Sequence, residues 1–217
     1  MKKIETFLLP AILLISCNNN SSSTTKSDSA SAITDSSNHI IDTSKTNQFG
    51  KAMDLSMDSI MIAKLTGDAD YDFAMMMKYH HDGAVRISNL ELINGTDPGI
   101  KKIAEKIIVE SKKDNALLDS FLNDYKPVNK SAFGSKAMDM MHQSVINGLK
   151  VHGGYIDLDF STLMIQHHEQ AIETAKEYLK AGKQKSMQNV AVAILKKEPA
   201  DIEQLKGWKH KHYPDTD

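Results

Sequence analysis

The 217-residue sequence contains a single cysteine, Cys17, and few aromatic residues. One cysteine cannot form an internal disulfide, and the absence of any later cysteine excludes a thiolate metal site in the folded domain. Aromatic residues make up only 6% of the chain, so methionine and aliphatic side chains must fill most of the core. A formal net charge of -2 provides no basic surface, which argues against nucleic acid as a partner.

Several catalytic motifs are also missing. The sequence has no glycine-rich phosphate loop, no Gly-x-Ser-x-Gly elbow and no haem-attachment motif. Nothing after the N-terminal segment is apolar enough to cross a bilayer. With no catalytic constellation, we expect a protein that is not an enzyme.

The N-terminus has the pattern of an export signal. Lys2 and Lys3 precede an apolar run over residues 7–15, which is too short to span a membrane as a mature helix. The run ends at Ser16-Cys17, which resembles a lipobox and predicts a lipoprotein signal peptide over residues 1–17, with Cys17 lipidated. An ordinary secretion signal with an incidental cysteine is the alternative. No acidic residue directly follows Cys17, so we expect an anchor in the outer membrane with the protein facing the periplasm.

The residues after Cys17 predict a tether followed by one domain. Residues 18–48 are rich in Ser, Thr and Asn and cannot bury enough apolar surface to offset their ordering entropy, so we expect disorder there. Residues 49–213 are long enough for one domain with a substantial core.

Within this domain, one motif occurs twice, 87 residues apart. The pattern is Asp-Phe-x-x-x-Met-x-x-His-His, and it begins at Asp72 and again at Asp159. With the same offset and no gap, Asp114 falls on Asp201. The domain is therefore an internal duplication, with one repeat over residues 50–126 and the other over residues 135–213.

The apolar periodicity within each repeat is helical throughout. Apolar residues recur at spacings of three and four, and no segment alternates with the period of two that indicates a strand. Capping and turn signals divide the domain into expected helices over residues 50–65, 68–93, 98–126, 131–149, 157–181 and 185–208, the last kinked near Pro199. We expect an all-α bundle of two long hairpins, each preceded by a shorter helix and related by a pseudo-two-fold axis.

The histidine pairs are the candidate metal ligands. The first histidine of each pair lies on the apolar face, so the pseudo-two-fold axis would bring His80 and His167 toward each other. Met77 and Met164 lie three residues before them, close enough on a helix to offer a thioether to the same point. Thioether with imidazole is a soft ligand set that suits Cu(I). The candidate set is His80, His81, His167, His168, Met77 and Met164, with Met76, Met53, Met57, Met138 and Met141 as less certain additions.

Two other interpretations of these residues stay open. Buried histidines often have a structural role, and methionine often fills irregular core gaps. A ferritin-like di-iron oxidase would need Glu-x-x-His on two helices. Methionine takes the place of that glutamate in both copies, so the oxidase is the weaker alternative.

The doubled Met-x-x-His-His-x-x-Ala motif, each copy introduced by Asp-x-x-x-x-Met, resembles the domain-of-unknown-function family 305 (DUF305). This resemblance extends from about residue 49 to residue 208. It implies a ferritin-like four-helix bundle and an exported protein, and the family includes periplasmic copper-binding proteins linked to copper tolerance. The family often has a further methionine six residues after the second histidine, where this chain has Ile87 and Thr174.

Together these observations predict an envelope lipoprotein that binds copper, as Cu(I), for buffering, sequestration or tolerance. The partners expected are a metal ion and the membrane that holds the lipid anchor, with a homo-oligomer left open. The alternative of a different class is a metal-free helical interaction module in which the histidines are structural.

Overall fold

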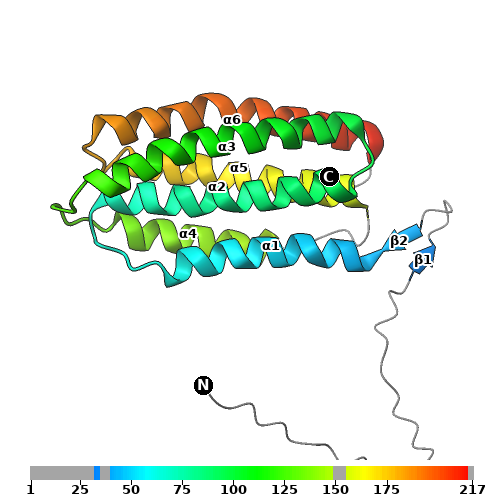
Figure 1. Ribbon diagram of the computed structural model, residues 1–217, viewed down its shortest axis with the longest axis horizontal. Coiled ribbons are helices and arrows are strands. Elements are labelled where there is room, and N and C mark those ends of the chain that lie inside the picture. The colour runs from blue at the N-terminus through cyan, green and yellow to red at the C-terminus, as the bar shows by residue number, and fades with distance from the viewer. Residues whose placement is uncertain (1–31, 35–39, 149–154, 215–217) are drawn as a thin grey trace, which may run out of the picture.

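The fold is a bundle of six helices, seen in a computed structural model that describes residues 32–34, 40–148 and 155–214 (Figure 1). Four long helices form two hairpins, and two shorter helices lie along one side of them. The helices are α1 (Thr43–Ile62), α2 (Ala69–Asn94), α3 (Pro98–Asp124), α4 (Phe133–Gly148), α5 (Ile156–Tyr178) and α6 (Lys185–His212). The all-α bundle expected from the sequence is confirmed.

Local capping explains where α2 and α3 begin. Asp68 caps α2 by accepting hydrogen bonds from the backbone N–H groups of Asp70 and Tyr71. Asp97 caps α3 in the same way, with Pro98 in the first turn, where its missing N–H costs no helical hydrogen bond. Both starts agree with the sequence patterns.

The bounds of three helices differ from expectation. Helix α5 starts at Ile156, so Asp157 and Asp159 lie inside its first turn rather than at its cap. Helix α1 starts at Thr43, before the expected start at Gly50. The sequence did not indicate this early start, because the polar residues before Gly50 carry no apolar periodicity. Helix α6 continues through Pro199 as far as His212.

A small antiparallel pair of strands precedes α1. It joins β1 (Ala32–Thr34) to β2 (Ile40–Asp42), and it falls within the stretch predicted to be a tether. The predicted signal peptide and Cys17 lie outside the described residues. Within the residues that the structure describes, no helix has the length and hydropathy needed to cross a bilayer.

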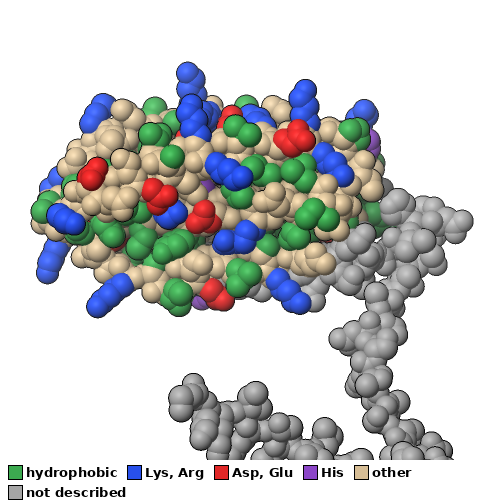
Figure 2. All heavy atoms as spheres, viewed as in Figure 1, with side chains coloured by type: hydrophobic (Ala, Val, Ile, Leu, Met, Phe, Trp, Pro, Cys, Tyr) green, Lys and Arg blue, Asp and Glu red, His purple; other side chains and the backbone are tan. Residues whose placement is uncertain are grey.

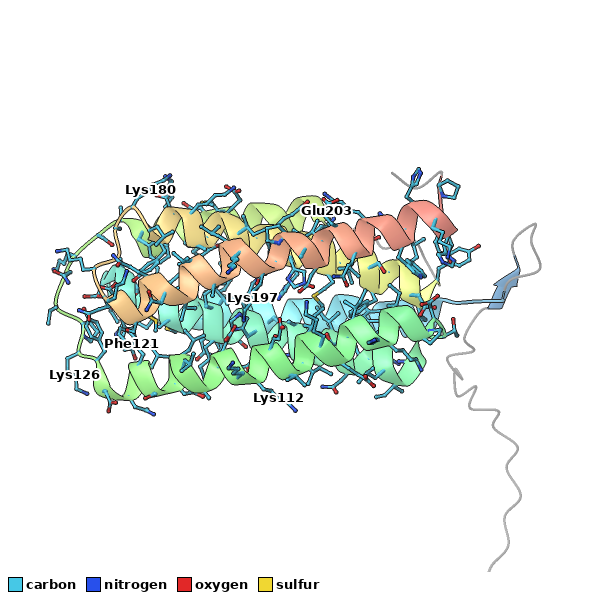
Figure 3. All side chains as sticks on the ribbon, turned by 90° about the horizontal axis from the view of Figure 1, so that it is seen from above. Lys112, Phe121, Lys126, Lys180, Lys197 and Glu203 are labelled. Carbon is cyan, nitrogen blue, oxygen red and sulfur yellow. The ribbon has the colours of Figure 1, made fainter. Side chains whose placement is uncertain are left out.

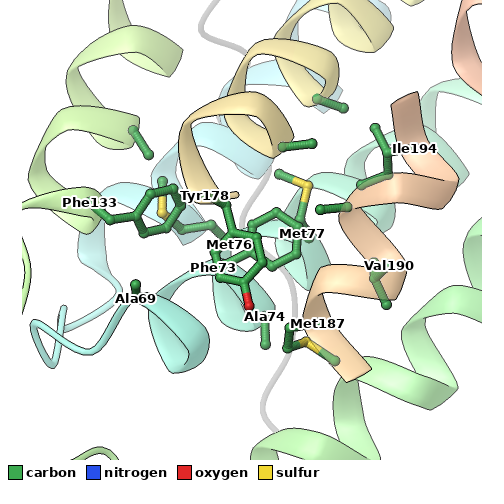
Figure 4. Close-up of a cluster of buried hydrophobic side chains, with 14 of the residues drawn as sticks. Ala69, Phe73, Ala74, Met76, Met77, Phe133, Tyr178, Met187, Val190 and Ile194 are labelled. Atoms are coloured by element: carbon green, nitrogen blue, oxygen red, sulfur yellow. The ribbon is translucent and has the colours of Figure 1, made fainter. Parts of the chain in front are cut away.

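The core divides into two apolar clusters, one toward each end of the bundle. The first holds Phe73, Met76 and Met77 from α2 with Tyr178 from α5 (Figure 4). The second holds Phe160 and Met164 with aliphatic side chains of α2, α3, α5 and α6. The outer surface in Figure 2 intersperses basic, acidic and apolar side chains, with no extended basic area on that face.

Each hairpin is fastened to the other by an aspartate in the first turn of its leading helix. Asp70 of α2 accepts hydrogen bonds from the Tyr178 hydroxyl at 2.5 Å and from the backbone N–H groups of Lys183 at 2.8 Å and Gln184 at 2.9 Å. These donors lie at the end of α5 and in the turn after it. The carboxylate therefore satisfies backbone donors that follow the helix and joins the two hairpins.

The opposite end carries the equivalent contact. Asp157, 87 residues after Asp70, accepts hydrogen bonds from the backbone N–H groups of Thr96 at 3.0 Å and Asp97 at 2.9 Å. Here Glu91 takes the position of Tyr178 in the repeat. Its side chain is fully buried, and burial first, then the neighbouring Asp157 carboxyl, raises the pKa of Glu91 to about 9. Glu91 therefore remains protonated at neutral pH and can donate to Asp157.

We predict that Tyr178→Phe destabilises the protein by about 1–3 kcal/mol, because it leaves a buried Asp70 oxygen without its hydroxyl donor. The measurement is urea unfolding at neutral pH. Tyr79→Phe is the control, since the half-buried Tyr79 has no hydrogen-bond partner among the described residues, and it should change stability by less than about 0.5 kcal/mol. Equal effects of the two substitutions would contradict the anchoring role of Tyr178.

We predict that Glu91→Gln makes the stability less sensitive to alkaline pH. In the unfolded chain Glu91 loses its proton near its ordinary pKa of about 4.3, whereas the folded protein keeps it up to about 9. The free energy of unfolding therefore falls as pH rises through this window, by up to about 1.4 kcal/mol per pH unit. Glutamine still donates to Asp157 and does not titrate. Parallel stability profiles of the two proteins between about pH 6 and pH 9 would refute this role.

Candidate metal centre

The first histidines of the two pairs meet at the middle of the bundle. His80 projects from α2 and His167 from α5, and their rings stack with centroids 3.5 Å apart and planes 16° from parallel. The rings are only 3% exposed. The repeat thus places two imidazoles face to face, one from each hairpin.

These two rings have free nitrogens. Among the described residues, neither the Nδ1 nor the Nε2 atom of His80 or His167 has a hydrogen-bond partner. Burial lowers the pKa of both imidazoles well below the usual 6.5, and the neighbouring imidazoles lower it further. A weak interaction with Gln170 opposes the shift at His80. Both rings are therefore neutral at physiological pH, the form in which histidine binds metals.

The second histidines are also buried. His81 and His168 are 6% exposed each, and each ring centroid lies 6.4 Å from that of the histidine before it. Burial lowers the pKa of His168 to about 4, while the charge of Asp201 opposes the shift. Burial likewise lowers the pKa of His81, which Asp114 opposes. The structure therefore encloses the second histidines as well as the first.

All four histidines line one small cavity of about 30 Å³, enough space for about two water molecules. The wall opposite the histidines comes from α3 and α6 and is rich in carboxylates. The residues that complete the lining are Ala84, Ile107, Glu110, Ser111, Asp114, Ile194, Lys197, Glu198 and Asp201.

Sequence reasoning did not assign these carboxylates to the site. One signal could have found two of them, because Asp114 and Asp201 occupy equivalent positions of the repeat. Glu198 has no such signal, since a serine stands 87 residues before it. Its Oε2 atom lies 3.8 Å from Nδ1 of His168, and burial, followed by the charges of Asp201 and Asp114, raises the pKa of Glu198 well above its usual value.

The predicted methionines lie elsewhere around the histidines. Met77 and Met164 are fully buried, one helical turn before His80 and His167, but neither lines the cavity. Met77 and Met76 pack in the first apolar cluster and Met164 in the second. Any thioether ligands would therefore approach the stacked imidazoles from the core rather than from the cavity.

The less certain methionines divide into two groups. Met141 is buried in the first apolar cluster with Met138 packed against it, so both contribute to the core. Met53 and Met57 belong to α1, and their side chains lie outside the described residues.

In the described part of the chain, no three His, Cys, Asp or Glu side chains, the paired histidines included, are arranged to hold one metal ion. Asp82 and Glu169, which follow the histidine pairs, lie on the outside, where Asp82 accepts from Asn115 and Glu169 pairs with Lys206. Thioether sulfur therefore matters to any complete ligand set.

Comparisons with known proteins identify similar structures. The solved structures described as "CopM in the Ag-bound form (by soaking)" and "CopM in the Ag-bound form (by co-crystallization)" each share 22% sequence identity with this chain at a TM-score of 0.52. They cover 66% of this chain and 96% and 97% of their own chains, respectively. At this identity the similarity shows the fold. No curated protein matches the sequence.

The family comparison covers most of the chain. The model for "Domain of unknown function (DUF305)" matches residues 20–122 and residues 70–209. Residues 70–122 take part in both matches, as an internally duplicated chain would produce. The resemblance noted in the sequence is confirmed, and the chain belongs to the DUF305 family.

Proposed function

We propose that this protein binds Cu(I) through histidine and methionine in the cell envelope, where it buffers or sequesters copper. The observation that carries this proposal is the stacked pair of His80 and His167, neutral, buried and without hydrogen-bond partners among the described residues. Leaving a polar group buried and unpaired costs about 1–3 kcal/mol, so such a pair is costly unless a ligand satisfies it.

The neighbouring groups favour a soft monovalent ion. Met77 and Met164, one turn from the stacked rings, would supply thioethers, and the second histidines would supply further imidazoles. CopM, which is similar in fold, was solved with bound silver, and Ag(I) has the same charge and softness as Cu(I). The carboxylates around the cavity would suit a harder ion, but no three of the described His, Cys, Asp or Glu side chains are arranged to hold one ion, so thioether sulfur would have to complete the ligand set.

The proposal includes a lipid anchor. Lipidation of Cys17 would hold the domain on the outer membrane facing the periplasm, and residues 18–48 would link the two. In that position the protein would intercept copper outside the cytoplasm and needs no catalytic turnover. In the competing function, a metal-free interaction module, the histidines would serve only to stabilise the fold.

We predict that substituting leucine for both His80 and His167 weakens Cu(I) binding at least about 100-fold. Loss of a side chain that only forms a hydrogen bond to a metal ligand already lowers metal affinity about 10–100-fold. Stability should stay within about 1 kcal/mol of the original or rise, because leucine removes buried nitrogens that lack partners. The measurements are an anaerobic Cu(I) titration of the apo protein and urea unfolding.

His142→Leu is the matched control, since His142 is exposed on α4, and it should leave Cu(I) binding unchanged. Replacement of all four paired histidines should abolish binding. Undiminished stoichiometry in that variant would refute the site, and a large loss of stability with unaltered binding would favour the metal-free interaction module.

We also predict that acid destabilises the apo protein through these histidines. In the unfolded chain they take up protons below about pH 6.5, but in the folded protein their lowered pKa values keep them neutral. Stability therefore falls as pH drops below about 6.5, by about 1.4 kcal/mol per pH unit for each histidine, until the folded pKa is reached. Thermal unfolding between about pH 7 and pH 5 should show a smaller loss for the double leucine variant. Equal losses would indicate that the two imidazoles are protonated in the folded protein.

A further inference from the structure

The cavity at the histidines reaches the surface between α3 and α6. Its lining includes buried imidazoles at one end and the exposed Lys197 with the half-buried Glu110 and Asp114 at the other. Helix α3 packs mainly on α2, and α6 mainly on α5, whereas α3 and α6 contact each other little. Figure 3 looks down on this seam, with Lys197 labelled on α6.

The mouth of the seam carries a net negative charge. Four carboxyl groups line the cavity with two ammonium groups beside them, and burial favours the neutral form of Glu198. Lys106 pairs with Asp201 at 2.5 Å and so offsets that carboxylate. Neither Glu110 nor Asp114 has an ion-pair partner in the described part of the chain, and Lys197 is the cation left to balance them.

Polar atoms without partners point to a ligand rather than to a structural network. Nδ1 of His81, Nε2 of His168 and Oε2 of Glu198 are buried atoms of residues that line the cavity, and no described residue forms a hydrogen bond with any of them. The two histidines are more than nine-tenths buried. A structural cluster of this kind would pair its members with each other, as Asp70 and Tyr178 do elsewhere in the bundle.

We propose that the α3–α6 seam is the route by which monovalent metal ions reach the histidines, with Glu110 and Asp114 as a cation-attracting vestibule and Glu198 at its neck. This inference rests on the proposed function. An approaching ion would lose water gradually, first to the carboxylates at the mouth and then to the imidazoles inside. Surface carboxylates in a narrow cleft raise the local concentration of cations and accelerate association.

The route predicts a change in binding rate rather than in stoichiometry. We expect Glu110→Gln with Asp114→Asn to slow Ag(I) association about threefold to tenfold at low ionic strength. The probe is aqueous silver nitrate in chloride-free buffer, mixed with the apo protein in a stopped-flow instrument and followed by ultraviolet absorbance. Because exposed charges are screened by salt, the difference should shrink at about 1 M sodium nitrate.

The control removes the same net charge from exposed positions on the two helices that form the seam, but away from the cavity. Asp124→Asn with Glu203→Gln changes exposed carboxylates on α3 and α6 that do not line the cavity, and it should bind Ag(I) at nearly the original rate. Equal rates for the vestibule variant and the original protein would overturn the route. Lost stoichiometry in the vestibule variant would also overturn it, because Glu110 and Asp114 would then be ligands. If the original protein bound no Ag(I) at equilibrium, the proposed function itself would fail.

Discussion

The arrangement of the histidines depends on two aspartates that join the hairpins at opposite ends. Asp70 at the start of α2 bonds to the end of α5, and Asp157 at the start of α5 bonds to the turn after α2, so the two helices are antiparallel and their relative register is fixed. His80 and His167 each follow their own aspartate by ten residues. The register that satisfies both ends therefore brings these two histidines opposite each other. A shift of one residue along either helix would rotate its histidine by about 100° away from its partner.

This anchoring explains how the fold tolerates an unfavourable feature at its centre. Two stacked imidazoles without hydrogen-bond partners would ordinarily be replaced by apolar side chains or paired with polar ones. Here the apolar clusters on either side and the carboxylate anchors at the ends stabilise the surrounding helices without any contribution from the rings. The site can therefore be kept neutral and unsatisfied before a ligand arrives. In the proposed function, the ion that enters supplies the missing partner.

Much of the fold and of the histidine site could be predicted from the sequence, because each motif occurs twice in the duplicated chain. The caps at Asp68 and Asp97 follow from local chemistry, and the inward face of His80 follows from helical periodicity. Among the cavity carboxylates, Asp114 and Asp201 share a position of the repeat, but Glu198 could not be found in this way, because it has no equivalent in the first repeat and its approach to His168 depends on how α6 lies against α5. The role of Glu91 could not be predicted from the sequence for a related reason. It matches a tyrosine in the other repeat, and its equivalence to Tyr178 becomes apparent once both are seen beside the anchoring aspartates.

The surroundings of the stacked rings differ on their two sides. Toward the core lie the thioether side chains of Met77 and Met164, and toward the seam lie the carboxylates that line the cavity. Carboxylates bind hard ions more readily than soft ones, whereas thioethers do the reverse. An ion that arrives through the seam would therefore pass a surface that favours positive charge in general before it reached ligands that favour soft metals. In the proposed function, the seam would attract cations of any kind and the thioethers would retain only soft ones, so the protein would collect copper without holding harder cations.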